Sequence, residues 1–149
     1  EDVVLQIAGT AFVYSRFHLD PQIPRETANA VKRAWMESYF RGTRGDELLV
    51  AVRDTTPVGF LASLRVTDRG KSVRVIDLIG VAKSHQGHGI GRALTGYFIA
   101  HSVGKCAVLR VGTQAANIPS LNLYFRTGFH ITESVYIVHA HGRERQMIR

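Results

Sequence analysis

The stretch from Val81 to Leu94 constrains the fold of this chain more than any other. An apolar strand ends at Val81, a polar loop follows, and Gly87, Gly89 and Gly91 lead into an amphipathic helix. Glycine has no Cβ, so its backbone can approach a ligand closely and adopt positive φ angles. The first N–H groups of a helix lack internal partners, and the helix dipole favours negative charge there. The segment therefore predicts a strand–turn–helix unit that holds a phosphate group.

Two better-known glycine motifs do not fit this stretch. A Walker loop needs Gly-Lys-Ser or Gly-Lys-Thr at its end, whereas Gly91 is followed by Arg92 and Ala93. The dinucleotide fingerprint needs a third glycine where this chain has Arg92 or Leu94. Glycines alone do not prove a phosphate site, so a loop that merely turns the chain stays open at this point.

A second informative segment begins at Asn117. Asn117 suits the N-cap of a helix that carries Pro119 in its first turn. Gly128 suits a left-handed residue at the end of the same helix. Tyr124 lies on this helix, and packing alone would explain it. The segment thus predicts a short, well-delimited helix whatever its function.

The remaining pattern predicts a mixture of helices and strands in one domain. Among the expected helices, the one that follows the first loop should place Val31, Ala34, Trp35, Ser38 and Tyr39 on one face. The expected helices cover residues 3–11, 24–40, 89–103 and 118–126, and the expected strands cover residues 48–53, 58–67, 73–82, 106–111 and 129–140.

Taken together, the two motifs resemble those of the GNAT superfamily of N-acetyltransferases. Residues Gln86–Gly91 match its Gln/Arg-x-x-Gly-x-Gly/Ala signature, and residues Asn117–Phe129 are similar to its Asn-x-x-(small)-x-x-Leu-Tyr-x-x-x-Gly-Phe pattern. The resemblance extends from about Leu48 to His139. It implies an α/β (α+β) fold with a mixed, mostly antiparallel twisted sheet, helices on its flanks and a splayed strand pair at a coenzyme A site. Residues 1–149 would form one such domain, which could be the C-terminal part of a longer protein.

The resemblance also implies that acetyl-CoA is the co-substrate. The amides of the glycine turn would hold the pyrophosphate, and the pantetheine would pair with the backbone near the end of the preceding strand. The residues that this assigns to CoA are Ile79, Gly80, Val81, Gln86, Gly87, His88, Gly89, Ile90, Gly91, Arg92, Asn117 and Ser120.

The reaction needs a proton donor, and the resemblance assigns this role to Tyr124. An amine that attacks a thioester expels a thiolate, which a nearby O–H group can protonate. A phenol with a pKa of about 10 keeps its proton at neutral pH. Asp77, in an apolar strand, is the candidate base, because burial would raise the pKa of its carboxyl. The alternatives are a water chain as base, a pairing role for Asp77 with Arg74 or Arg110, and His18 as a rival base.

The acceptor is expected to be the primary amine of a small molecule, acetylated by direct transfer in a ternary complex. Residues 15–21 and 111–117 resemble a subgroup that acetylates amino sugars carried on nucleoside diphosphates. By that resemblance Arg16 and His18 would contact the acceptor or its diphosphate, and Gln114 would line the cleft. Acetylation of a protein or peptide N-terminus, and a non-catalytic module that senses acyl-CoA, are the alternative functions.

Composition excludes several other classes of function. The net charge is +7, but the basic residues are scattered apart from Arg143, Arg145 and Arg149, so we expect no nucleic-acid partner. No apolar run has the length of a membrane span, so we expect no membrane partner either. The single cysteine suits a reducing cytoplasm. His139 and His141 lack a third ligand, so no metal is expected. A homodimer, common in the family, is the expected alternative to a monomer.

Overall fold

The computed structural model describes residues 1–142, so the arginines of the tail lie outside the described part. Its elements are α1 (Asp2–Thr10), α2 (Arg25–Phe40), β1 (Glu47–Arg53), β2 (Thr56–Asp68), β3 (Lys71–Val81), a short 3-10 turn η1 (Lys83–His85), α3 (Ile90–Ser102), β4 (Val108–Val111) and α4 (Ile118–Arg126). Every expected element is confirmed except the last strand. None of the helices within residues 1–142 is both long and apolar enough to cross a membrane.

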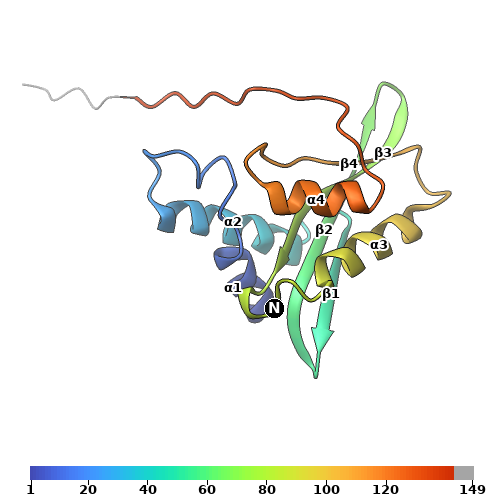
Figure 1. Cartoon of the computed structure of the whole chain (residues 1–149), viewed down its shortest axis with the longest axis horizontal. Helices are drawn as coiled ribbons and strands as arrows, with labels where there is room; N and C mark the ends of the chain where they lie inside the picture. The colour runs from blue at the N-terminus through green and yellow to red at the C-terminus, as the bar shows by residue number, and fades with distance from the viewer. Residues whose placement is uncertain (143–149) are drawn as a thin grey trace, which may run out of the picture.

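The four strands form one twisted sheet in the order β1-β2-β3-β4 (Figure 1). The first three strands are antiparallel neighbours, and β4 pairs with β3 in parallel. Helices α1 and α2 lie on one side of the sheet, and α3 and α4 lie on the other (Figure 1). The expected fold, a mixed and mostly antiparallel sheet flanked by helices, is confirmed.

The sheet separates two hydrophobic clusters. Phe60, Ala62 and Leu78 pack against α1 and α2, whereas Leu61 and Ile76 face α3 and α4. This alternation follows from the period of two residues in a strand. Every member of the two clusters that the structure buries is at most 6% exposed. Helices of the described chain therefore cover both faces of the sheet.

A β-bulge interrupts the pairing of β2 with β3. Ala62 faces Leu78 across the strands and Ser63 faces Ile76, so Asp77 is the extra residue. A bulge places two consecutive side chains on the same face of a strand. Asp77 therefore points toward α2, as its hydrogen bond from Trp35 shows.

Strands β3 and β4 part after four paired residues, from Val73–Val108 to Ile76–Val111. The second half of β3, from Asp77 to Val81, continues along β2, and no strand within residues 1–142 pairs with its other edge. The expected splayed strand pair is thus present. It leaves a row of backbone groups at the centre of the sheet open to a ligand.

The expected strand over residues 129–140 is wrong: the described part of that segment, residues 129–142, has no regular structure. Its alternating apolar and β-branched residues favour extended backbone, but a strand forms only where that backbone also pairs with a neighbour. Residues 129–142 pair with none of the four strands. Most of the segment is exposed and leaves the body of the protein after Phe129 (Figure 1). Local pattern predicted its conformation but could not supply its partner.

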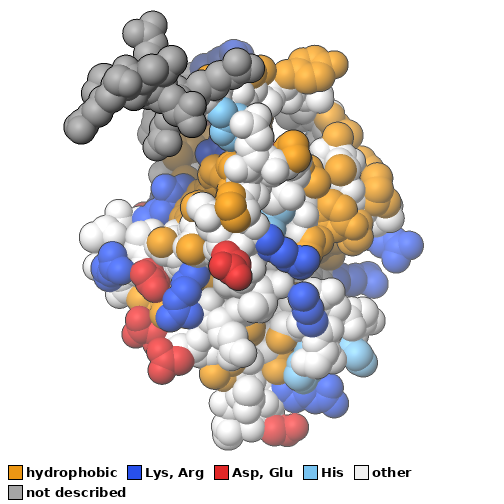
Figure 2. All heavy atoms as spheres, turned by 90° about the vertical axis from the view of Figure 1, so that its left-hand side faces the viewer, with side chains coloured by type: hydrophobic (Ala, Val, Ile, Leu, Met, Phe, Trp, Pro, Cys, Tyr) orange, Lys and Arg blue, Asp and Glu red, His pale blue; other side chains and the backbone are white. Residues whose placement is uncertain are grey.

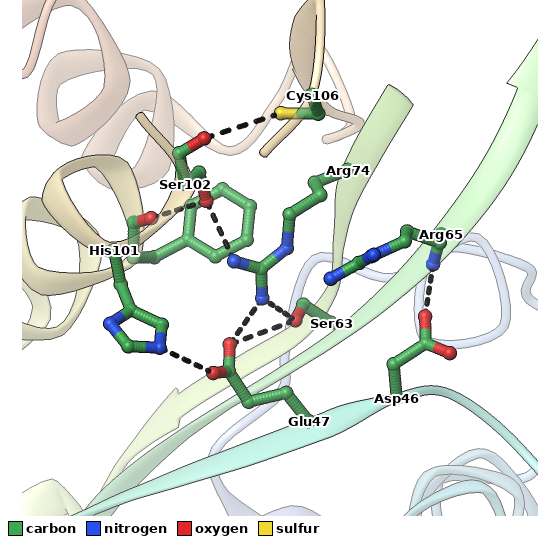
Figure 3. A network of polar contacts seen from close by, with 9 residues as sticks. Asp46, Glu47, Ser63, Arg65, Arg74, His101, Ser102 and Cys106 are labelled. Carbon is green, nitrogen blue, oxygen red and sulfur yellow. Dashed lines mark hydrogen bonds and ion pairs between the residues drawn. The ribbon is translucent and has the colours of Figure 1, made fainter. Parts of the chain in front are cut away.

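A buried arginine in the part of β3 that pairs with β4 links β1, β2 and α3 (Figure 3). Arg74 is only 3% exposed, and its guanidinium pairs with Glu47 and donates to Ser63 Oγ at 3.1 Å and Ser102 Oγ at 2.9 Å. The guanidinium also lies 4.9 Å from the centre of the Phe98 ring. Because both terminal nitrogens of the guanidinium have partners, this network stabilises the packing of α3 on the sheet.

Candidate functional site

One cavity of about 490 Å³ opens where β3 and β4 part. Its walls come from the second half of β3, the glycine turn, residues 111–120, Tyr124 of α4 and residues 11–17. Its volume lies in the range of small-molecule sites. Most of the residues expected at the site, from widely separated parts of the chain, therefore meet around a single space.

The glycine turn forms one end of this cavity. Gly87 and Gly89 both have φ of 80°, the left-handed region that favours glycine, and no atom occupies the space beside either Cα. Gly89 is the N-cap of α3, and no side chain caps this helix. Within the described chain, no backbone acceptor outside α3 receives an N–H of residues 87–92. The turn thus offers free amides and a positive helix end to an anion.

Of the residues assigned to CoA, most line the cavity, and two do not. Ile79, Gly80 and Val81 present the unpaired edge of β3, as expected for a strand that pairs with pantetheine. The side chain of Gln86 donates to Val81 O at 3.0 Å and so closes the turn. His88 and Arg92 are exposed outside the lining, although their backbones belong to the turn.

Helix α4 positions the phenol at the middle of the cavity. Asn117 caps the helix by accepting from Ser120 N at 3.3 Å, and it donates to Thr113 Oγ1 at 3.1 Å. Gly128 has φ of 94°. The N-cap and the left-handed end expected from the sequence are thus confirmed. Tyr124 is 5% exposed, lines the cavity, and packs edge-on against Phe129 at 5.8 Å between ring centres.

Burial raises the pKa of Tyr124 to about 12. The charged phenolate is disfavoured in an apolar setting, so the hydroxyl keeps its proton throughout the neutral range. The side chain can therefore act as a proton donor to a group in the cavity.

The expectation that the pKa of Asp77 is raised is wrong. Burial alone would raise it, but hydrogen bonds from Arg44, Tyr39 and Trp35 outweigh burial and hold the pKa below its usual value. Arg44 donates to both carboxylate oxygens, at 2.7 and 2.8 Å, and the other two donate to Oδ2 at 2.7 and 2.9 Å. A carboxylate held in this way stays ionised and is a poor base at neutral pH.

The arginine that pairs with Asp77 is neither of those considered from the sequence. Arg74 pairs with Glu47, and Arg110 pairs with Asp68 in the exposed β2–β3 hairpin. Arg44 lies in the loop after α2, where its sequence neighbourhood gives no sign of a buried carboxylate partner. Its contact with β3 depends on the bulge and could not be predicted.

The part of the cavity on the α2 side of β3 is lined by basic and aromatic side chains. Lys32 is 8% exposed, and its ammonium lies 4.2 Å from the Trp35 ring, 5.0 Å from Phe12 and 6.0 Å from Phe17. Arg16 lies 4.8 Å from the Phe17 ring on the same side of the cavity. This end therefore has cations and rings, whereas the glycine turn has free amides.

Lys32 was missed from the sequence because the buried stripe of α2 was placed on the wrong residues. The structure buries Ala28, Lys32 and Met36, spaced four apart, and leaves Ala34 exposed. A stripe with Lys at its centre looks polar by composition. A lysine at helical spacing between two apolar residues was the signal that could have revealed it.

Of the three residues expected to bind the acceptor, two line the cavity and one does not. Arg16 and Gln114 line the cavity. His18 does not, because its ring nitrogens bond to Ser15 Oγ at 2.6 Å and Asn29 Oδ1 at 2.9 Å. That geometry gives His18 a role in fixing the loop before α2, and it leaves neither ring nitrogen free to accept a proton from a ligand.

Residues 129–142 return to the cavity near their end. Ile137 lines it, and His139 and His141 both donate to Asp20 Oδ2. The pKa of Asp20 falls to about 2, chiefly because of the hydrogen bond from His139. The structure thus adds to the two histidines a third group within reach of a metal ion, which the sequence did not indicate. In the described chain the three groups satisfy one another and fasten the segment to the loop.

Comparison with known proteins agrees with this geometry. The sequence profile of the Acetyltransferase (GNAT) family matches residues 11–129, which is most of the chain. The chain belongs to the GNAT family. The match includes the glycine turn, the splayed strands and Tyr124, and it ends just after α4.

Individual relatives of this GNAT chain are distant. The spore coat polysaccharide biosynthesis protein SpsD of Bacillus subtilis (strain 168) is 27% identical over 139 residues, which is 93% of this chain and 46% of that protein. This chain therefore spans a little under half of the length of its curated relative.

Solved structures share the fold. The aminoglycoside N-acetyltransferase AAC(6')-Iy in complex with CoA is 21% identical, with a TM-score of 0.60 over 74% of this chain and 88% of that one. A transcriptional regulator from Bacillus halodurans C-125 is 17% identical, with a TM-score of 0.65 over 91% of this chain and 90% of that one. At such identities the likeness shows the architecture of a GNAT domain and no more.

The face of the molecule that Figure 2 shows has no continuous basic stripe. Lys and Arg side chains are dispersed over that face, with acidic side chains between them (Figure 2). A long nucleic acid would favour a continuous basic path. The cationic groups that line the cavity suit a small anionic ligand better.

Proposed function

We propose that this GNAT domain transfers the acetyl group of acetyl-CoA to the primary amine of a small molecule in a ternary complex. The observation that carries the proposal is a single cavity that runs from a turn of free amides, along an unpaired strand edge, to a buried phenol. Each part meets one need of the reaction: binding of a pyrophosphate, alignment of an extended thioester, and protonation of a thiolate.

The residues present fit CoA. The amides of Gly87 to Gly91 would hold the pyrophosphate, since the open space beside the two left-handed glycines admits it. Backbone groups of Ile79 to Val81 would pair with the pantetheine amides, because this edge has no other neighbour in the described chain. Asn117 and Ser120, at the start of α4, line the opposite wall.

Bound acetyl-CoA supplies a thioester carbonyl as electrophile and a thiolate as leaving group. The acceptor nitrogen forms the new C–N bond while the C–S bond breaks. Tyr124 donates its proton to the departing sulfur, and its elevated pKa ensures that the proton is present. Burial around the phenol excludes bulk water and strengthens the interaction.

For Asp77 we propose positioning of the acceptor in place of the base role. Its Oδ2 accepts three hydrogen bonds, whereas Oδ1 accepts one, from Arg44, and retains capacity for another. A permanent carboxylate in the lining would attract an amine and orient it toward the thioester. In this scheme a water chain, and not Asp77, accepts the proton that the amine loses.

For the acceptor we propose an amino sugar, nucleotide-linked as in the subgroup that residues 15–21 and 111–117 resemble. The support is a cavity end that combines aromatic rings with cations, namely Trp35, Phe12, Phe17, Lys32 and Arg16. Sugar rings pack on aromatic faces, and cations bind phosphate groups. SpsD, named for spore coat polysaccharide biosynthesis, agrees with a sugar-related acceptor.

Release of free thiol from acetyl-CoA tests the activity. The purified chain is assayed with a panel of amines, including amino sugars, sugar-nucleotide amines and a peptide N-terminus. We expect thiol release that depends on a small amine. Release with the peptide alone would favour N-terminal acetylation, and CoA binding without release from any amine would favour the sensor function.

Replacement of Gly89 by valine is expected to weaken binding of CoA about tenfold or more, because a β-branched residue at positive φ is strained and fills the phosphate space. Calorimetric titration with CoA and with phosphate-free pantetheine measures the effect, and only CoA should lose affinity. Gly104→Val is the matched control, since Gly104 has φ of 73° and equally open surroundings outside the cavity. Equal weakening in both variants would refute the phosphate cradle.

A further inference from the structure

We infer that Lys32 is the centre of an anion-binding subsite, and that the amine acceptor carries an oxyanion, a carboxylate or a phosphate, that reaches it. The inference rests on the proposed function and adds a chemical requirement on the acceptor. It follows from a buried cation without an anionic partner at the acceptor end of the cavity.

The positive charge of Lys32 has no negative partner in the described part of the chain. The residue as a whole is 8% exposed, and its ammonium has no ion-pair or hydrogen-bond partner among residues 1–142. Because no fully buried side-chain nitrogen in this part of the chain lacks a partner, the ammonium is accessible from the cavity that Lys32 lines. Buried charges are normally paired because desolvation is costly. The rings of Phe12 and Trp35 offset part of that cost through cation–π contacts. They leave the hydrogen-bond donors of the ammonium unused.

The charged groups around Lys32 are mostly positive. Arg16 shares the Phe17 ring with Lys32 and has no ion-pair partner in the described chain. The nearest carboxylate, Asp77, is already held by both nitrogens of Arg44 that face it. The cluster thus has three cations and one committed anion, and two like charges stand together without a counter-ion. Repulsion between the two cations is unfavourable in the empty cavity, and a bound anion would compensate it.

The protonation of Lys32 is also sensitive to its surroundings. Burial lowers the pKa of Lys32 to about 8, Asp77 opposes this shift, and Arg16 and Arg44 add to it. At neutral pH most of the side chain is still charged. A bound oxyanion would stabilise that charge, so binding should weaken as the pH rises above about 8.

The subsite is separate from the expected CoA phosphates. Lys32 belongs to α2 and contacts residues 12–17, on one side of β3, whereas the glycine turn leads into α3 on the other side (Figure 1). An anion at Lys32 therefore comes from the acceptor. Because Asp77 lies beside the same cations, an acceptor with both an ammonium and an oxyanion would be held at two points.

Fluorescence of the single tryptophan reports directly on this subsite. Trp35 is the only tryptophan of the chain, and the ammonium of Lys32 lies 4.2 Å from its ring. Acetate, inorganic phosphate and pyrophosphate are titrated with CoA present at saturation, so that the glycine turn is blocked. We expect a saturable change in emission, and the stronger ligand distinguishes a carboxylate from a phosphate source.

Lys32→Met keeps the aliphatic stem and removes the charge, so it should fold and bind the anion at least about tenfold more weakly. Lys32→Arg should retain part of the binding. Lys71 is exposed at the start of β3 and lies outside the cavity lining, so Lys71→Met should leave the binding unchanged. Absence of a saturable signal, or equal affinity in Lys32→Met and the parent chain, would overturn the inference.

Turnover separates this inference from the proposed function. Glucosamine, glucosamine 6-phosphate and muramic acid present the same amine without an anion, with a phosphate and with a carboxylate. We expect Lys32→Met to raise KM at least about tenfold more for the anionic acceptors than for neutral glucosamine. An equal loss of kcat with all three would make Lys32 a base and overturn the subsite. No turnover of any amine, with anion binding intact, would contradict the proposed function alone.

Discussion

Replacement of Tyr124 by phenylalanine is expected to lower turnover about a hundredfold or more while affinity for CoA stays nearly unchanged. The change removes one oxygen and retains the ring that packs against Phe129, so the fold should persist. Without the hydroxyl the thiolate leaves unprotonated, which raises the barrier of the transfer step alone. Thiol release measures the rate, and calorimetry measures CoA binding.

The matched control is Tyr97→Phe, because Tyr97 lies on α3 with 56% exposure and outside the cavity. The pH profile gives a second check. A donor must be protonated, and the pKa of Tyr124 is about 12, so the rate should not fall between pH 7 and pH 9 through loss of this proton. Unchanged turnover in Tyr124→Phe would contradict its role as the acid, whereas an alkaline fall between pH 7 and pH 9 that the variant abolishes would contradict the raised pKa of Tyr124.

The parts of the site that the sequence predicted are those that local rules determine. Glycines at positive φ, an uncapped helix start and an asparagine N-cap are set by residues within one or two turns of chain. The phosphate turn and α4 were therefore found with close boundaries. The splay between β3 and β4 followed only from the family resemblance, since the paired length of two strands has no local signature.

The parts that were missed depend on contacts far apart in the sequence. The direction of Asp77 depends on a bulge opposite β2, and its ionisation depends on an arginine 33 residues away. Burial alone predicts a raised pKa, and three donors reverse it. Lys32 is buried among rings from separate parts of the chain, namely Phe12, Phe17 and Trp35. The sequence shows which charged residues such a site contains, but it does not show which partners neutralise their charges.

Loss of Glu47 is expected to destabilise the fold strongly. Arg74 is 3% exposed, and Glu47 is its only carboxylate partner in the part of the chain that the structure describes (Figure 3). Glu47→Ala leaves the guanidinium buried and uncompensated, with only the hydroxyls of Ser63 and Ser102 as acceptors. Breaking a buried pair from one side costs about 3–5 kcal/mol, a large fraction of the free energy of unfolding of a domain. Glu47 is itself 24% exposed, so the lower end of this range is expected.

Urea unfolding measures the loss as a shift of the midpoint at constant slope. Arg110→Ala is the control, because its pair with Asp68 is exposed and such pairs contribute at most about 1 kcal/mol. The double change Glu47→Leu with Arg74→Met should recover most of the stability, since apolar side chains of similar size need no compensation. A loss in Glu47→Ala no larger than in Arg110→Ala would mean that water reaches the guanidinium. In that case the apolar contacts of α3, which include Leu94 and Phe98, would hold it on the sheet without help from the ion pair.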